Sequence, residues 1–196
     1  MTLILASTSK VRARLLEAAG VPFEACPSRL DEQAVKTALL AEGASPAAVA
    51  EALAEMKALR LSTNHPEVFV LGCDQVLAFA GRLIDKSESL AKARALLLSL
   101  RGKTHSLITA AVLAKGGMPV WRKRERADLH MRDFSEEFLD AYLEAEGDSI
   151  LSAVGCYHLE GRGVQLFERV EGDYFAILGL PLLPLLAALR EHGMLR

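Results

Sequence analysis

Residues 3–16, LILASTSKVRARLL, place a short apolar run directly before three hydroxyl residues and a segment with three positive charges. The apolar run at 3–6 is typical of a buried β-strand. Ser9 is a favourable N-cap, so the spacing predicts a helix that continues to about Ala19 and ends at Gly20. A strand followed at once by a helix indicates an α/β fold. The hydroxyl and cationic groups fit either an ordinary capped helix or a site for a phosphorylated ligand.

The rest of the chain alternates further predicted helices and strands. The pattern predicts helices over 32–62 with a break at 43–46, over 87–102 with Ser87 as N-cap, over 135–147 and after Pro181. It predicts a strand and hairpin over 68–84 around Gly81, strands over 104–114 and 120–134, and two strands on either side of Glu171 and Gly172. The hairpins make the expected sheet mixed, and we expect residues 1–196 to form a single domain.

Composition excludes several classes of protein. The chain has 196 residues, of which 51% are hydrophobic and 24% charged, and its net charge of −2 argues against broad nucleic-acid binding. Its three cysteines lack any C-x-x-C spacing, so we expect no disulfide framework and a reducing compartment. Residues 1–10 have no basic n-region and only a very short apolar run, so we expect no signal peptide, and the apolar stretch 176–189 is too short to span a bilayer. These features predict a cytoplasmic protein that does not enter membranes.

Three familiar catalytic patterns are also excluded. The segment RGKTHS (101–106) is similar to part of a P-loop, but Leu97 stands where that motif needs a glycine, and a helix precedes it. The five histidines are scattered, which argues against an all-histidine metal site. No G-x-S-x-G sequence is present, so a serine-hydrolase elbow is not expected.

Asp74 follows the apolar run VFVLGC at 68–73. A buried carboxylate without partners is costly, so Asp74 either meets a cation or a metal, or opens a turn at the end of the strand. Taken singly, Glu32 is typical of a solvated helix start. Lys57 and Lys86 are, in the same way, typical of surface lysines.

Taken together, these segments resemble the Maf-like nucleoside triphosphate pyrophosphatases nearly end to end. The similarity runs through the opening 3–16, DE at 31–32, AEMKA at 54–58, GCDQV at 72–76, IDK at 84–86, LRGKTHSLITAAVL at 100–113 and the segment 156–182. The segment LRGKTHSLITAAVL fits the family's L-S-G-x-x-H-x-V-x-T stretch, which explains its similarity to part of a P-loop.

The resemblance implies a fold, an activity and a cofactor. The fold would be one two-lobed α/β domain of Maf and ITPase type, with a mixed twisted sheet flanked by helices and a cleft between the lobes. The activity would be hydrolysis of a nucleoside triphosphate to the monophosphate and pyrophosphate, with a divalent cation, Mg²⁺ or Mn²⁺. A homodimer is an expectation at the level of the family.

The resemblance also implies roles for individual residues. Asp74 would be the general base and, with Glu32, a metal ligand. Hydroxyls and N–H groups at a helix start suit phosphate oxygens, and an arginine adds a forked cation. The implied phosphate-binding residues are Ser7, Ser9, Arg12, Lys57 and Lys86.

Three departures from the family pattern bear on the substrate. Lys10 and Val11 replace its proline and first arginine, Ser87 replaces a proline, and LSAVG at 151–155 lacks the D-K-A-G lysine. One branch of the family acts on dTTP and UTP, and another acts on 7-methyl-GTP. The chain resembles the second branch at Gln75 and Glu160, whereas Val11 matches neither.

We therefore expect 7-methyl-GTP to be favoured, because a glutamate can accept from guanine N1–H and its amine and can offset the positive charge of the methylated base. The alternatives are a dTTP- or UTP-preferring enzyme of the same family, a nucleotide-sensing regulator of cell division with little catalysis, and a phosphatase that releases inorganic phosphate.

Overall fold

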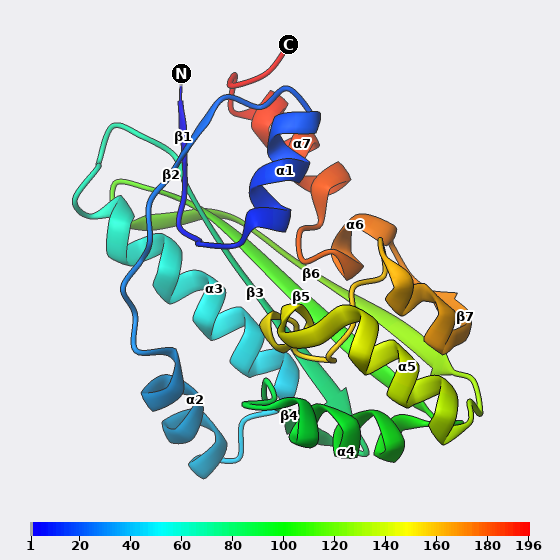
Figure 1. Ribbon diagram of the computed structural model, residues 1–196. Helices are drawn as coiled ribbons and strands as arrows, with labels where there is room; N and C mark the ends of the chain where they lie inside the picture. The colour runs from blue at the N-terminus through cyan, green and yellow to red at the C-terminus, as the bar shows by residue number, and fades with distance from the viewer. Residues whose placement is uncertain (1) are drawn as a thin grey trace.

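The computed structural model describes residues 2–196, and its strands form one mixed sheet in the order β2-β1-β3-β5-β6-β7, with β4 paired to β3 (Figure 1). The strands are β1 (Leu3–Leu5), β2 (Phe23–Ala25), β3 (Val70–Phe79), β4 (Arg82–Ile84), β5 (Thr104–Lys115), β6 (Met118–Met131) and β7 (Phe167–Glu171). β1 is parallel to β2 and β3, and the other pairs are antiparallel. The predicted α/β domain with a mixed sheet is confirmed.

Helices flank this sheet on both faces. They are α1 (Lys10–Ala18), α2 (Glu32–Ala41), α3 (Pro46–Ser62), α4 (Leu90–Leu100), α5 (Glu136–Glu146), α6 (Tyr174–Ile177) and α7 (Leu182–Glu191), with 3-10 helices η1 (Gly147–Ser152) and η2 (Arg162–Leu166). None of the helices within residues 2–196 is long and apolar enough to cross a membrane. The three cysteines are free.

Most predicted helix starts are confirmed. Ser9 caps α1, and Ser45 caps α3 with Pro46 in its first turn, so the predicted break between α2 and α3 is present. The prediction of Ser87 as the cap of the next helix is wrong. Ser89 has an extended backbone and caps α4 by accepting a hydrogen bond from the Lys92 N–H, so the helix begins at Leu90.

The segment around Glu171 and Gly172 also differs from the prediction. β7 ends at Glu171, but no second strand follows it in the described chain. Instead, the Asp173 carboxylate accepts a hydrogen bond from the Ala176 N–H and starts the short helix α6. A local side-chain cap therefore outweighs the β-propensity of the sequence DYFAI.

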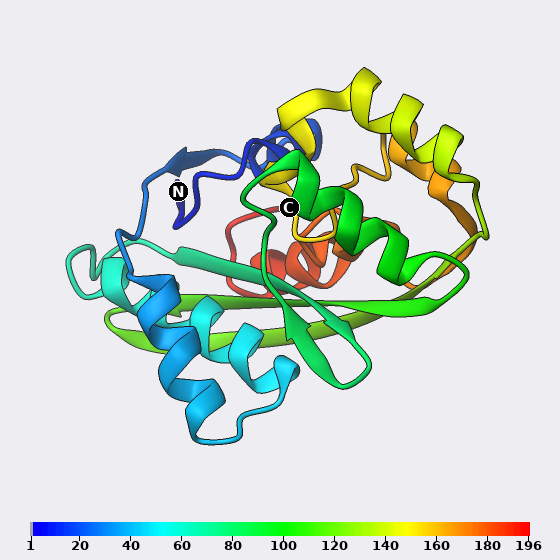
Figure 2. The same ribbon diagram turned by 60° about the horizontal axis from the view of Figure 1, so that its bottom comes forward.

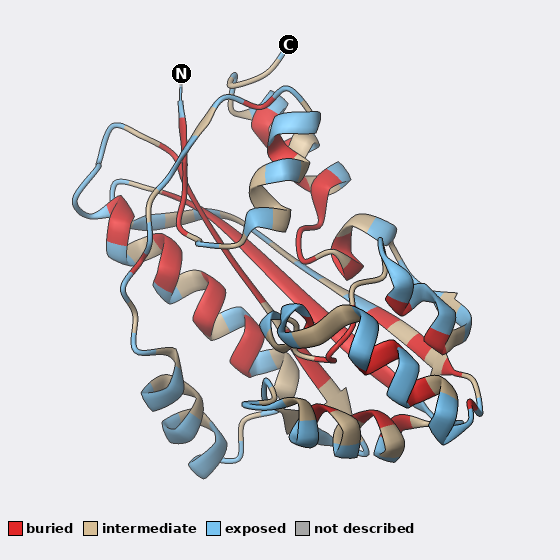
Figure 3. Ribbon diagram, in the orientation of Figure 1, coloured by how far each residue is buried: buried red, intermediate tan, exposed pale blue. Residues whose placement is uncertain are grey.

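The two faces of the sheet are covered differently. α3 packs on one face with α2 outside it, whereas α1 and α7 at one end and α4 and α5 at the other cover the opposite face (Figures 1 and 2). Buried residues follow these contacts along α3 and the central strands (Figure 3). On β3, Leu71 and Cys73 pack with α1 and α7, and Leu77 packs with α4 and α5. Gln75 therefore lies between the two groups of helices.

In the part of the chain that the structure describes, one edge of β3 has no neighbouring strand near Gln75. β1 pairs with β3 at Val70 and Leu71, and β4 pairs with it from Leu77 onward. Between these two pairings, residues 72–76 have no neighbouring strand on that side within residues 2–196. The middle of β3 thus carries Asp74 and Gln75 on an edge where a ligand can approach.

Candidate active site

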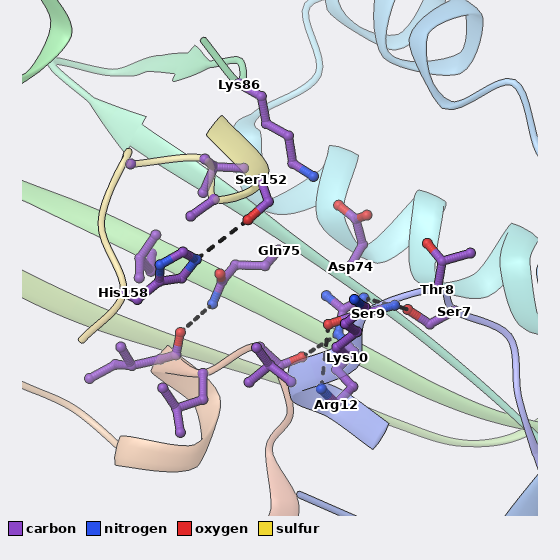
Figure 4. A pocket seen from close by; sticks show the side chains of 18 of the residues that line it. Ser7, Thr8, Ser9, Lys10, Arg12, Asp74, Gln75, Lys86, Ser152 and His158 are labelled. Carbon is purple, nitrogen blue, oxygen red and sulfur yellow. Dashed lines mark hydrogen bonds between the residues drawn. The ribbon is translucent and has the colours of Figure 1, made fainter. Parts of the chain in front are cut away.

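A cavity of about 1070 Å³ lies beside the open edge of β3. Its lining comes from the loop before α1, the starts of α1 and α2, helix α3, strand β3 and the loops after β4, η1 and α6 (Figure 4). The cavity brings together every site residue that the sequence predicted: Ser7, Ser9, Val11, Arg12, Glu32, Lys57, Asp74, Gln75, Lys86 and Glu160.

Lys57 joins the two predicted carboxylates. Its Nζ lies 2.7 Å from Asp74 Oδ1 and 2.9 Å from Glu32 Oε1. The Lys57 and Asp74 side chains are only 7% and 8% exposed, whereas Glu32 is 45% exposed in the first turn of α2. Lys57 is therefore no surface lysine. Asp74 lies inside β3 rather than at a turn, so the turn alternative is wrong.

Gly72 explains how Lys57 reaches Asp74. A Cβ on Gly72 would lie 2.1 Å from the Ala54 carbonyl oxygen and 2.7 Å from the Ala58 N, so α3 passes directly over this glycine. Because successive side chains alternate along a strand, Asp74 points to the same face as Gly72. The close approach of helix and strand therefore places the Lys57 ammonium against the Asp74 carboxylate.

The carboxylates of Glu32 and Asp74 fit a divalent cation that binds together with the phosphates of a ligand. Asp74 Oδ2 is buried and has no hydrogen-bond partner in the described chain, which is costly for a carboxylate oxygen. No group of three or more His, Cys, Asp or Glu residues within 2–196 could hold a metal. Mg²⁺ is commonly bound by one or two carboxylates together with substrate phosphates, so Glu32 and Asp74 suffice for that mode.

Arg12 connects three distant parts of the chain. Its Nε donates to the Gly179 carbonyl at 2.7 Å, and its Nη1 donates to Ser7 Oγ at 3.2 Å and to the Cys73 carbonyl at 3.1 Å. The Cys73 carbonyl lies on the open edge of β3, where no strand satisfies it. Arg12 thus connects the cavity walls, and among the described residues its Nη2 has no hydrogen-bond acceptor.

The hydroxyl loop is ordered by its own contacts. Ser7 Oγ accepts a hydrogen bond from the Ser9 N–H at 3.1 Å, and Ser9 Oγ accepts from the Arg12 N–H at 3.4 Å. The start of α1 lines the cavity, and a helix N-terminus is a favourable place for a phosphate.

Lys86 is the predicted cation that keeps its ammonium open to the cavity. Desolvation by the surrounding walls lowers the pKa of Lys86, and the neighbouring cations Arg12, Lys36 and Lys57 lower it further, although Glu32 opposes them. Its side chain is exposed and points into the cavity (Figure 4). An anionic ligand would relieve this crowding of positive charge.

The predicted specificity residues come from different elements: Val11 lies at the start of α1, whereas Gln75 lies on β3. Gln75 Nε2 donates to Thr109 Oγ1 at 2.8 Å and to the carbonyls of Ala176 and Ile177 at 3.0 and 2.9 Å. Its nitrogen is therefore held by the chain, which leaves Oε1 as the atom that can accept from a ligand. Glu160 is exposed in the loop between η1 and η2.

Sequence reasoning missed other residues that line the cavity. His158 faces Ser152, with Nε2 3.4 Å from its Oγ, at the end where Gln75 lies (Figure 4). The sequence contained no signal for it beyond one of five scattered histidines. Lys10 and Arg14 also line the cavity, and the basic opening stretch indicated them. Lys36 comes from α2 and had no sequence signal.

Known proteins match this chain over nearly its whole length. The family described as Maf-like protein matches residues 2–192. A protein of Granulibacter bethesdensis named nucleoside triphosphate pyrophosphatase is 53% identical over 195 residues, covering 100% of this chain and 99% of that protein. One of the same name from Caulobacter vibrioides is 54% identical over 191 residues, covering 97% and 96%. A 7-methyl-GTP pyrophosphatase of Brucella abortus is 46% identical over 190 residues, covering 97% and 96%.

Solved structures are more distant. A HAM1 protein from Coxiella burnetii has a TM-score of 0.44 and 13% identity, over 68% of this chain and 74% of that one. A nucleoside-triphosphatase described as a dITP/XTP pyrophosphatase from Mycobacterium abscessus has a TM-score of 0.38 and 18% identity, over 78% and 97%.

Proposed function

Because this chain belongs to the Maf-like protein family, we propose that it is a nucleoside triphosphate pyrophosphatase that hydrolyses its substrate to the monophosphate and pyrophosphate. The observation that carries this proposal is one cavity in which the buried Asp74 and the partly exposed Glu32 lie beside several cationic side chains. Residues 1–196 would act as a single domain, in the cytoplasm, where its cysteines stay free.

The reaction needs a water molecule that attacks the α-phosphorus and positive charge around the leaving pyrophosphate. Asp74 takes the proton from that water through Oδ2, the oxygen that Lys57 leaves free. Glu32 and Asp74 would hold a divalent cation, on which Maf-like pyrophosphatases generally depend and which supplies charge stabilisation when bound. The residues that would bind the phosphates are Ser7, Ser9, Arg12, Lys57 and Lys86.

The finer part of the proposal concerns the base. We propose that 7-methyl-GTP is favoured, with Gln75 and Glu160 at the end of the cavity that receives the base. A carboxylate can accept two hydrogen bonds from guanine and is attracted to a methylated, cationic base. Uracil and thymine offer a single donor and would leave it poorly paired. The Brucella abortus relative with 46% identity bears a name that agrees with this preference.

Product analysis tests the reaction. The wild-type protein with Mg²⁺ should release pyrophosphate from a nucleoside triphosphate and no inorganic phosphate. Asp74→Asn should remove this turnover by at least about a hundredfold while the protein stays folded and still binds nucleotide. Inorganic phosphate as the first product would identify a different phosphohydrolase, and binding without any turnover would identify a nucleotide sensor.

A substrate panel tests the preference. We expect kcat/KM to be higher for 7-methyl-GTP and GTP than for dTTP and UTP, and Glu160→Gln to reduce that difference. Glu160 is exposed, so the substitution should leave the fold intact. A wild type that prefers dTTP or UTP, or a Gln variant with an unchanged ranking, would contradict the preference and leave the pyrophosphatase proposal standing.

A further inference from the structure

The Lys57 ammonium occupies the position between the two carboxylates that a metal ion would be expected to bind. It contacts Asp74 Oδ1 at 2.7 Å and Glu32 Oε1 at 2.9 Å, and its side chain is 7% exposed. One lysine therefore forms ion pairs with both proposed metal ligands and offsets one of their two negative charges. Such a buried pair keeps its geometry because removing one partner leaves an uncompensated charge.

The surroundings add further positive charge. Lys86 and Arg12 line the same cavity, and Lys36 lies nearby with its own partner, Asp85, at 3.1 Å. A divalent cation that met the carboxylates while Lys57 stayed in place would lie beside a unit positive charge at ion-pair distance, where repulsion is strong. A triphosphate changes this balance, because its oxygens can accept both the metal and the lysine.

The Lys57 side chain is flexible enough to exchange its carboxylate partners for phosphate oxygens. Its flexible four-carbon side chain lines the cavity together with Ser7, Ser9 and Lys86, the residues assigned to the phosphates. An ammonium has three donors and no fixed plane, so it can exchange a carboxylate for a phosphate oxygen without a new backbone position. The guanidinium of Arg12, fixed by three hydrogen bonds, lacks this freedom.

We propose that Lys57 holds the place of the divalent cation in the nucleotide-free protein and passes to the phosphates when nucleotide and metal bind together. Lys57 then opposes metal binding before nucleotide arrives and supports phosphate binding afterwards. This inference rests on the proposed function, because it assumes that Glu32 and Asp74 bind a metal. It assigns Lys57 a second role besides the phosphate contact that the sequence indicated.

The test is a titration of the full chain with Mn²⁺ alone, followed by the electron paramagnetic resonance signal of free Mn²⁺. Without nucleotide, the wild type should bind Mn²⁺ only weakly, with a Kd no tighter than about 1 mM. Lys57→Met should bind it about tenfold more tightly, because the competing charge is gone. Lys57→Gln, which keeps a hydrogen-bond donor, should behave like the Met variant and serves if that variant fails to fold.

Lys86→Met is the matched control. It removes one positive charge from the same cavity, and within residues 2–196 Lys86 forms no ion pair or hydrogen bond with Glu32 or Asp74, so Mn²⁺ affinity should change by less than about threefold. Tight Mn²⁺ binding by the wild type, or equal or weaker binding by the Lys57 variants, would overturn the inference. Pyrophosphate release by the same wild-type preparation is measured separately, so failure of this inference is distinct from failure of the proposed function.

Discussion

At the scale of the residue, Arg12 shows how one side chain can serve both fold and site. The sequence indicated a phosphate-binding arginine. In the structure its guanidinium donates to two backbone carbonyls, those of Cys73 and Gly179, and to the hydroxyl of Ser7. Such contacts between segments far apart in the chain have no local sequence signal. The arginine could be identified from the motif, but its partners could not.

The guanidinium of Arg12 is hydrogen-bonded to the chain, whereas Lys86 is exposed, and this difference leads to a paired prediction. Arg12→Ala should lower both kcat/KM and the free energy of unfolding, the latter by about 2 kcal/mol, because part-buried carbonyls lose their donor. Lys86→Ala should lower kcat/KM strongly but change the free energy of unfolding by no more than about 0.5 kcal/mol, because Lys86 is exposed. Urea unfolding and pyrophosphate release measure the two effects. Equal losses of stability, or a fully active Lys86→Ala, would contradict this division of roles.

At the scale of the element, the contact of α3 with β3 decides the geometry of the site. Local signals predicted where most elements begin: Ser9 before α1, and Ser45 with Pro46 before α3. They failed where two serines competed for the start of α4, and where Asp173 capped a helix in a β-prone sequence. Patterning therefore predicts that a helix or strand exists more reliably than where it ends.

Gly72→Ala tests this contact directly. Its Cβ would lie 2.1 Å from the Ala54 carbonyl oxygen, so α3 must move away from β3. We expect a loss of about 3 kcal/mol in the free energy of unfolding, typical of overpacking, and a loss of kcat/KM in the folded protein as Lys57 separates from Asp74. Gly161→Ala is the stability control, since its Cβ would meet only ordinary contacts at 3.7 and 3.9 Å. A Gly72→Ala protein as stable as the control would show that α3 adapts.

At the scale of the whole molecule, the site forms where several packing contacts coincide. The edge of β3 is open because its pairing with β1 ends at Leu71 and its pairing with β4 begins only at Leu77. On the face of the sheet, Gln75 lies between the group of α1 and α7 and the group of α4 and α5. The motifs predicted which residue types would carry the chemistry. The double ion pair of Lys57 and the loop contacts of Gln75 depend on tertiary packing, so the sequence could not indicate them.

The buried imidazole of His105 links this packing to global stability. His105 is 2% exposed on β5, its Nε2 lies 2.7 Å from the Tyr157 hydroxyl, and its Nδ1 has no partner in the described chain. Desolvation lowers the pKa of His105 to about 4, with His130 adding to this effect and Asp128 opposing it. The neutral form is therefore the one that the folded protein accepts.

The consequence is that the free energy of unfolding begins to fall at a pH above the usual pKa values of carboxyl groups. The unfolded chain binds a proton near pH 6.5 and the native protein only near pH 4, so the free energy of unfolding falls as the pH decreases between these values. At about pH 5, His105 should account for about 2 kcal/mol of the loss relative to about pH 7.5.

Lowered carboxylate pKa values, as at Asp128, add to the total decrease, so urea unfolding of the wild type is compared with that of His105→Gln. The variant cannot titrate at this position and should lose about 2 kcal/mol less over the same interval. Parallel curves for the two proteins would mean that His105 becomes charged in the native state at little cost, and that the core around Tyr157 admits water.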